Sequence, residues 1–262
     1  MQLTFLGTCA GTEPMPGRKH TSFVIEYGGE VFWFDAGAGC SYTAHLLGID
    51  LLAVRAIFIS HTHMDHIGGL ANLLWDIRKI NGRCRDLSRR ISGKRIDLFI
   101  PDLQVWQGIM QVLRATEQNF EIDFELEAAS YGDGSIFSSA GFAVSALHNR
   151  HLGTPLPGDP WKSHSFRIEA AGKRVVFSGD LKEIDELEPL LDDCDLLLVE
   201  TGHHRVEDIC AYAREKPVKR LGFLHHGRAI LADPDGEARK ARRIFGDQVF
   251  LAEDGMRIEI GA

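Results

Sequence analysis

The fold of this chain is decided by the stretch His61-Thr62-His63-Met64-Asp65-His66. It directly follows an apolar run, residues 56–60, that has the composition of a buried strand. His61 and His63 lie two residues apart, so on an extended backbone both imidazoles leave from one side. Asp65 and His66 fall where the chain turns into an expected helix. Imidazole nitrogen and carboxylate oxygen are ligands that zinc and similar dications accept, so the hexapeptide predicts a metal site at a strand end.

Length and composition indicate one large α/β domain. The chain has 262 residues with 44% hydrophobic content, and no linker of low complexity divides it, so we expect a single domain over 1–262. No window resembles a signal peptide or a membrane span. The five scattered cysteines form no C-x-x-C pair and are typical of free thiols in the cytoplasm. A net charge of −8 argues against broad binding to nucleic acid or to an anionic membrane.

Apolar runs and glycine turns predict the elements of two similar halves. We expect strands at 2–6, 22–27, 31–35, 56–60, 96–100, 142–147, 165–170, 174–178, 195–199, 221–224 and 248–252, and helices at 67–79, 103–116, 206–215 and 237–245. The segments 23–35 and 166–180 both have the pattern of a β-hairpin that ends at an aspartate. Two such halves would each contribute a sheet, with the sheets packed face to face and helices outside.

Further metal ligands are available at the ends of later strands. Asp180 ends the run 174–178 with a carboxylate that can bridge two cations, although an aspartate at this place is also a common helix cap. His148 and His151 follow one expected strand, and two more histidines, His225 and His226, follow another. The residues alone leave open which histidine of each pair is a ligand.

Two other segments each allow two interpretations. The basic residues between 78 and 95 are either a rim that attracts an anionic substrate or, as is more usual for a charge run, a solvated helix end and loop. The loop 152–163, rich in proline and glycine, either covers the pocket and offers Trp161 as a stacking face for a base or sugar, or is an ordinary rigid loop.

At this point the sequence resembles the metallo-β-lactamase superfamily over essentially its whole length. The motif His61-x-His63-x-Asp65-His66 is similar to the superfamily's hallmark, and the segments around Asp35, His151, Asp180 and His226 are similar to its other motifs. The resemblance implies a four-layer αβ/βα sandwich with two mixed sheets packed face to face. It also implies two divalent ions, with zinc expected first and manganese or iron as alternatives. The implied ligands are His61, His63, His151 and Asp180 at one ion, and Asp65, His66, Asp180 and His226 at the other, while Asp35 supports the ligand loop.

Within the superfamily the chain is most similar to the branch of ribonuclease Z and the cyclic phosphodiesterases. The opening segment 5–11 and the stretch from Glu200 to His204 carry this resemblance. It implies that His204, oriented by Glu200, protonates the leaving group, with His203 as second candidate, and that Asp65 belongs with Glu200 and His204 among the catalytic residues. Only 28 residues, 152–179, separate His151 from Asp180, so the long tRNA-gripping arm of ribonuclease Z is absent. Relatives are often dimers, so a homodimer is expected.

The implied activity is hydrolysis of a phosphodiester by a hydroxide held between two ions. The candidate substrates are an RNA end, a cyclic nucleotide and a small cyclic phosphate. Two alternatives stay open: a hydrolase of carboxylic esters, thioesters or lactams on the same fold, and a metal-binding sensor without catalysis.

Overall fold

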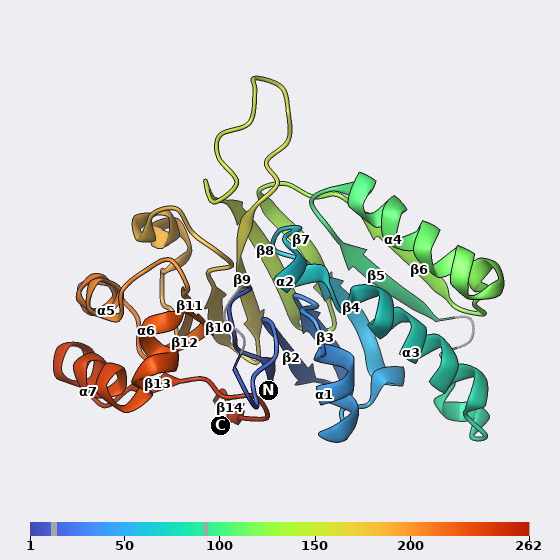
Figure 1. Cartoon of the computed structure of the whole chain (residues 1–262), viewed down its shortest axis with the longest axis horizontal. Helices are drawn as coiled ribbons and strands as arrows, with labels where there is room; N and C mark the ends of the chain where they lie inside the picture. The colour runs from blue at the N-terminus through green and yellow to red at the C-terminus, as the bar shows by residue number, and fades with distance from the viewer. Residues whose placement is uncertain (12–14, 92–93, 262) are drawn as a thin grey trace.

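Two seven-stranded β-sheets form the centre of the molecule in a computed structural model of the chain, which describes residues 1–11, 15–91 and 94–261 (Figure 1). The first sheet has the order β14-β1-β2-β3-β4-β5-β6, with β1 (Gln2–Gly7), β2 (Ser22–Tyr27), β3 (Glu30–Phe34), β4 (Val54–Phe58), β5 (Arg95–Phe99), β6 (Glu125–Ala129) and β14 (Arg257–Glu259). The second has the order β13-β12-β11-β10-β9-β8-β7, with β7 (Gly134–Ser139), β8 (Phe142–His148), β9 (His164–Ala170), β10 (Lys173–Phe177), β11 (Leu196–Thr201), β12 (Leu221–His226) and β13 (Val249–Leu251).

Helices cover the outer face of each sheet (Figure 1). The first sheet is covered by α1 (Cys40–Leu46), α3 (Leu70–Arg83) and α4 (Leu103–Thr116), and the second by α5 (Val206–Arg214), α6 (Arg228–Ala232) and α7 (Pro234–Phe245). The expected four-layer αβ/βα sandwich is confirmed. None of the helices in the described ranges combines the length and the apolar composition needed to cross a membrane.

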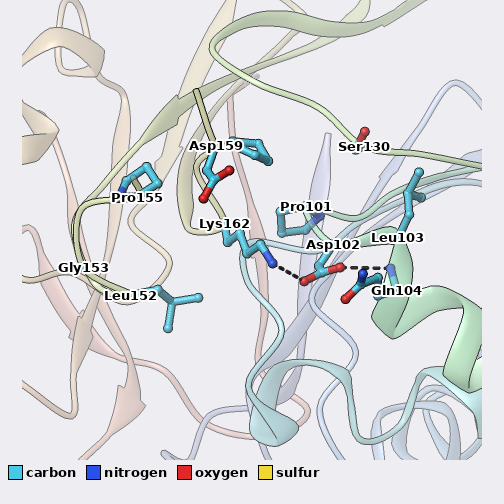
Figure 2. Close-up of a pocket in the computed structure, with 11 residues that line it drawn as sticks. Pro101, Asp102, Leu103, Gln104, Ser130, Leu152, Gly153, Pro155, Asp159 and Lys162 are labelled. Carbon is cyan, nitrogen blue, oxygen red and sulfur yellow. Dashed lines mark hydrogen bonds and ion pairs between the residues drawn. The ribbon is translucent and has the colours of Figure 1, made fainter. Parts of the chain in front are cut away.

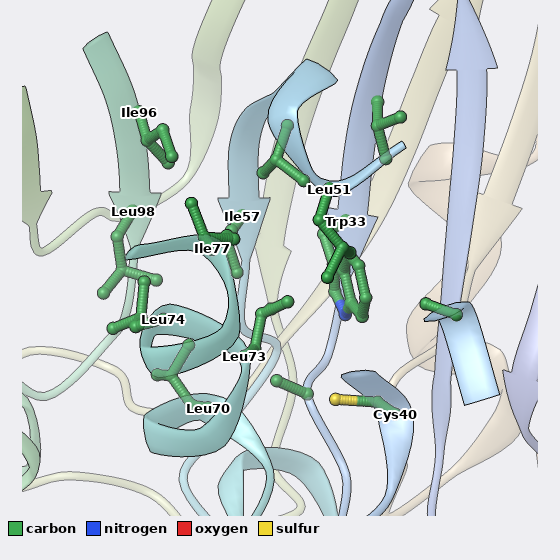
Figure 3. Close-up of a cluster of buried hydrophobic side chains, with 14 of the residues drawn as sticks. Trp33, Cys40, Leu51, Ile57, Leu70, Leu73, Leu74, Ile77, Ile96 and Leu98 are labelled. Carbon is green, nitrogen blue, oxygen red and sulfur yellow. The ribbon is translucent and has the colours of Figure 1, made fainter. Parts of the chain in front are cut away.

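Side-chain alternation along the strands divides the core into layers. In β3, Phe32 and Phe34 face the second sheet, whereas Val31 and Trp33 pack against the helices (Figure 3). In β11, the residues at 196 and 198 lie between the sheets and those at 197 and 199 face α5. Both central strands are therefore apolar on both faces, as strands buried inside a layered fold must be.

Aromatic rings fill the space between the sheets. The ring of Phe34 lies with its centroid 4.9 Å from that of Phe23 and 5.0 Å from that of Phe58, both stacked, and meets Phe166 of the second sheet edge-on at 6.1 Å. Such contacts hold the two sheets at a fixed separation.

The two expected hairpins are present. β2 and β3 pair antiparallel across a turn in which Gly28 and Gly29 both have positive φ. β9 and β10 pair across Ala171 and Gly172, which also both have positive φ, the requirement of a tight two-residue hairpin turn. Each hairpin is followed by parallel strands, so each sheet contains one run of parallel strands, β3 to β6 and β10 to β13.

The expected helix at 67–79 is divided. The chain forms a short α2 (Met64–Ile67), and α3 begins only at Leu70. Gly68 and Gly69 separate the two helices, because the backbone of residue 69 is pressed against the loop after β3. A Cβ at Gly69 would lie 2.3 Å from the carbonyl oxygen of Gly37.

Sequence patterns did not predict α1, α6, β6, β7 and β14. In β6 the burial alternates between intermediate and exposed, and β14 is a three-residue edge strand in which only Ile258 is buried. The pairing of such edge strands depends on a neighbour rather than on their own apolar content.

Half of the eight basic residues between 78 and 95 form ion pairs: Arg78, Lys79, Arg89 and Arg95. Arg78 and Lys79 both contact Glu117, at 3.0 and 2.8 Å, and Arg95 pairs with Asp97 and Glu127. Arg95 begins β5, at the end of the sheet opposite the loops that carry the histidines. The structure therefore favours the interpretation as a solvated, ion-paired surface.

Removing the Phe34 ring is expected to leave a cavity between the sheets. For Phe34→Ala we expect the free energy of unfolding to fall by about 3–5 kcal/mol, as for other buried aromatic truncations. Urea denaturation in excess chelator measures this without a contribution from bound metal. Val112→Ala, at a position that is 57% exposed on α4, is the control and should change stability by less than about 0.5 kcal/mol. Equal stability of the two variants would contradict this description of the core.

Candidate metal centre

Loops at the carboxyl ends of parallel strands converge at one edge of the two sheets. The hexapeptide 61–66 follows β4, Asp180 follows β10, and His225 lies at the end of β12. His151 joins them from the loop after β8. In layered α/β folds this edge is where ligands bind, because the loops there are free to carry polar side chains.

The first set of donors is His61, His63, His151 and Asp180. One ligand atom of each residue lies within 4.8 Å of the others. The Nε2 atoms of His61 and His151 are 3.8 and 3.7 Å from Oδ2 of Asp180, and Nε2 of His151 is 3.2 Å from Nδ1 of His63. Three imidazoles and one carboxylate are a donor set that suits zinc.

The second set of donors is Asp65, His66, Asp180 and His225. Nε2 of His66 is 3.3 Å from Oδ1 of Asp180, and Nε2 of His225 is 3.4 Å from its Oδ2. Oδ2 of Asp65 lies 3.1 Å from the same nitrogen of His225. Asp180 therefore belongs to both sets, as expected of a bridging carboxylate.

Asp35 positions the hexapeptide. Its carboxylate accepts hydrogen bonds from the backbone and hydroxyl of Ser60, at 2.7 and 2.8 Å, and lies 2.7 Å from Nδ1 of His66. Fixing Nδ1 of His66 in this way leaves Nε2 directed at Asp180. Carboxylates commonly orient metal-binding histidines in this way. Asp35 therefore supports the loop that carries the ligands, as the resemblance implies.

The centre brings the buried carboxylate of Asp180 close to several buried histidines, and these groups shift one another's pKa values. Burial alone would raise the pKa of Asp180, but the charges of His225 and His66 outweigh it and hold that pKa well below its usual value. For His225, burial would lower the pKa, yet the Asp180 charge and the hydrogen bond with Asp65 raise it to about 9. For His61 burial dominates and the pKa is lowered. Asp180 is thus an ionised acceptor surrounded by imidazoles.

The donors fit a pair of divalent ions. Nε2 of His61, Nε2 of His66 and Oδ1 of Asp180 are buried atoms without a hydrogen-bond partner among the described residues. Buried polar atoms are normally satisfied, and here all three face the same cluster. Donor type, convergence and unsatisfied lone pairs together support the assignment of these two sets as the ligands.

The choice of His226 as a ligand is not supported, because the structure brings His225 to the cluster instead. Nε2 of His226 lies 2.8 Å from the carbonyl oxygen of Ala252, and its ring is fully buried, which lowers its pKa to about 3. The pairing of β11 with β12 shifts register so that Glu200 faces Leu224 and Thr201 faces His226. His225 is the extra residue of this bulge, with φ of 50°, and the bulge turns its side chain into the centre.

Glycines let the backbone approach the ligands closely. A Cβ on Gly202 would lie 2.7 Å from Nδ1 of His225, and one on Gly11 would lie 2.8 Å from Oδ2 of Asp65. Any side chain at these positions would displace a ligand. Gly11 belongs to the opening segment 5–11, and its close approach to Asp65 means that this segment forms part of the wall around the ligands.

Glu200, His203 and His204 lie beside the second donor set. Glu200 is completely buried and accepts a hydrogen bond from the backbone N–H of His203 at 2.8 Å, and its Oε1 lies 3.0 Å from Nδ1 of the same residue. That hydrogen bond raises the pKa of His203. Nε2 of His204 lies farther from the same oxygen of Glu200, at 3.7 Å, and 3.3 Å from the carbonyl oxygen of Leu181. The geometry therefore favours His203 over His204, the reverse of the order expected from sequence.

A pocket of about 570 Å³ adjoins this side of the centre. Its walls include His203, His225, Gly202, Arg205 and Arg228. We refer to it as the glycine pocket. Arg205 and Arg228 make this lining basic, which suits an anionic group close to the candidate ligands.

Two alanine variants test whether His225 or His226 is the metal ligand from β12. We expect His225→Ala to lose metal from the second donor set, whereas His226→Ala keeps full metal content. His226→Ala should lower the free energy of unfolding by about 1–3 kcal/mol, because it removes the hydrogen bond between Nε2 and the carbonyl oxygen of Ala252, which Arg18 also contacts, and leaves a cavity at a fully buried ring. Metal analysis after dialysis and calorimetric zinc titration measure these effects. Normal zinc stoichiometry in His225→Ala together with reduced stoichiometry in His226→Ala would show that His226 is the ligand, as the resemblance implied.

Comparisons with known proteins agree with this fold. The chain is 23% identical over 318 residues to a ribonuclease Z of Archaeoglobus fulgidus, covering 99% of this chain and 97% of that protein. Among solved structures, the short form of human tRNase Z is similar with a TM-score of 0.75 and 22% identity, covering all of both chains. The metallo-β-lactamase fold protein YhfI of Bacillus subtilis is similar with a TM-score of 0.73 and 19% identity, covering 98% of this chain and 99% of that one.

These likenesses confirm the resemblance to the metallo-β-lactamase superfamily that the hexapeptide indicated, and to ribonuclease Z, which the segment 5–11 and the stretch from Glu200 to His204 indicated. Residues 1–230 match the family described as anti-Pycsar protein Apyc1, which is most of the chain and includes every candidate ligand. The chain therefore belongs to the anti-Pycsar protein Apyc1 family.

Proposed function

We propose that this protein is a metal-dependent hydrolase that cleaves a small phosphodiester, with His203 as the proton donor to the leaving group. The observation that carries the proposal is the sharing of Asp180 between two complete donor sets. Two divalent ions bound there would supply Lewis acidity for the phosphoryl group and lower the pKa of water. Zinc is the proposed metal, with manganese and iron as the alternatives that the same donors accept.

The chain's own residues account for the proton that the departing oxygen needs. Glu200 accepts hydrogen bonds from both the backbone and Nδ1 of His203, so the ring is held in place and Nε2 is left to donate. The ring centroid of His203 lies 5.1 Å from that of His151 and 5.9 Å from that of His225, so it borders both donor sets. The hydrogen bond to Glu200 raises the pKa of His203 and so favours the protonated ring, which can donate this proton.

A small substrate is favoured over a folded RNA. Between His151 and Asp180 the chain forms only the loop 152–163 and the β9–β10 hairpin. The glycine pocket has the size of a small-molecule site, and its arginines suit a phosphate. An RNA end is the second candidate substrate, and the likeness to ribonuclease Z supports it.

The proposal predicts which substrate class the metal-loaded enzyme accepts. We expect turnover of bis-p-nitrophenyl phosphate and of cyclic nucleotides, and at least about 100-fold lower rates with thioester and lactam substrates. Asp180→Ala should lose metal and activity together, because its carboxylate belongs to both donor sets. Measured kcat/KM values across this panel test the assignment. Preferred turnover of thioesters would support the second hydrolase class, and a complete lack of turnover would support the sensor.

The role of His203 predicts a dependence on the leaving group. With an alkyl leaving group, His203→Ala should lower kcat by about 10²–10⁴, because an alkoxide needs a proton to depart. With p-nitrophenolate, a stable anion, the loss should be much smaller. His204→Ala is the matched control and should show no such difference between leaving groups. Equal losses for both leaving groups in His203→Ala would assign this histidine a structural role.

A further inference from the structure

The bulge that brings His225 to the candidate metal centre depends on support at both edges of β12. On one edge, Thr201 of β11 pairs with His226. On the other edge, β13 pairs with residues 221–223 and ends there. His225 has φ of 50°, a conformation that is costly for a residue with a side chain and is retained only where its surroundings enforce it. A further segment is therefore needed on the β13 side of the strand, next to His225.

The opening segment takes this place. The backbone N–H of His226 donates to the carbonyl oxygen of Thr8 at 2.7 Å, and the carbonyl oxygen of His226 accepts from the backbone N–H of Ala10 at 3.1 Å. Cys9, which lies between them, forms a parallel bridge with His226. Both backbone groups of the residue after His225 are thus paired, so the end of β12 cannot straighten without breaking these hydrogen bonds.

Thr8 is itself fixed by a network of side chains. Its buried hydroxyl donates to Oδ1 of Asp254 and accepts from Nη1 of Arg18, both at 2.8 Å. The same nitrogen of Arg18 also donates to the carbonyl oxygen of Ala252 at 2.9 Å. Oδ2 of Asp254 accepts from the backbone N–H of Lys19 at 2.6 Å. We refer to Thr8, Arg18 and Asp254 as the threonine clamp.

The clamp fixes the place where the chain crosses from one sheet to the other. β1 is held by its own neighbours, β14 and β2. Thr8 lies directly past the end of β1, where the chain leaves the first sheet and pairs with β12 of the second. The crossing reaches β12 at the residue next to a candidate ligand. The network therefore lies where the support of that ligand requires it.

The opening segment also touches a second ligand of the same donor set. Gly11 is pressed against Asp65, and the carbonyl oxygen of Gly11 lies 3.1 Å from Nε2 of His20. Asp65 and His225 both belong to the second donor set, and Oδ2 of Asp65 lies 3.1 Å from Nε2 of His225. A shift of the opening segment would therefore disturb two ligands of the second donor set together.

We propose that Thr8 is a positioning residue for the metal ligand His225. It acts through the backbone of His226, and Arg18 and Asp254 hold it in place. The inference rests on the proposed function only for the metal site and does not need turnover. Loss of the Thr8 hydroxyl is expected to loosen the bulge, to turn His225 away from the centre and to weaken metal binding at the second donor set.

Two substitutions at Thr8 separate the hydroxyl from the shape of the side chain. Thr8→Val keeps the shape and removes the hydroxyl, whereas Thr8→Ser keeps the hydroxyl and removes a methyl group. In Thr8→Val the zinc affinity of the second donor set should fall about 10–100-fold, the usual effect of losing a group that orients a ligand. The first donor set should keep its affinity, and Thr8→Ser should bind zinc like wild type. Zinc titration against a chelator, followed through the imidazole nitrogen NMR signals of individual histidines, measures the two sets separately.

Hydrogen exchange in the metal-free protein tests the bulge without any ion. The backbone N–H groups of His226 and Ala10 are the donors of the pairing. Both should exchange roughly tenfold faster in Thr8→Val and at the wild-type rate in Thr8→Ser. If Thr8→Val does not fold, Arg18→Gln is the second variant, because it keeps the Thr8 hydroxyl and removes one of its partners. It should show the same selective loss of zinc from the second donor set.

The matched control breaks a different contact beside the centre. Nζ of Lys162 donates to Oδ2 of Asp102 at 2.6 Å and so fastens the loop that follows His151 (Figure 2). Lys162→Met should leave the zinc affinity of the second donor set and the exchange of the His226 amide at wild-type values. Unchanged zinc affinity in Thr8→Val, an equal loss in Thr8→Ser or in the control, or an equal loss from both donor sets would overturn the inference.

The proposed function and this inference fail in different experiments. If wild type binds zinc at both donor sets but cleaves no phosphodiester, the proposed function fails, while the zinc titrations of the Thr8 variants still decide the role of the clamp. If wild type binds no zinc at the second donor set, the inference fails as well.

Discussion

The site depends on a single buried carboxylate, that of Asp180. It is only 2% exposed, and an ionised carboxylate in such a place is stable only if opposite charge surrounds it. Nitrogen atoms of His61, His66, His151 and His225 lie within 3.3–3.8 Å of its two oxygens. These histidines come from the hexapeptide after β4, from the loop after β8 and from the end of β12, so the electrostatic requirement of one residue ties the two halves of the fold together at this edge.

The packing of the sheets makes this convergence possible. The stacked rings around Phe34 and Phe58 fix one sheet against the other, and β4 carries Phe58 on its way to the hexapeptide. At the tip of β3, Asp35 takes a left-handed conformation with φ of 51°, as His225 does at the end of β12 with φ of 50°. Such backbone conformations are costly for residues with a side chain and are retained where the surroundings require them. Here they turn polar side chains out of the strands and toward the centre.

The sequence by itself determined the layered fold and most of the donors. The hexapeptide after a buried strand, the aspartate after a second hairpin and the alternation of β3 are local patterns that carry their own physical reason. The tertiary structure alone decided between His225 and His226, because a bulge in β12 depends on how β11 pairs with it and leaves no mark in the chain. It also favours His203 over His204 as the proposed proton donor, because Nδ1 of His203 lies 3.0 Å from Oε1 of Glu200, whereas Nε2 of His204 lies 3.7 Å from that oxygen and 3.3 Å from the carbonyl oxygen of Leu181. Neighbouring residues of one type are equivalent in sequence, and only the path of the backbone in three dimensions distinguishes their side chains.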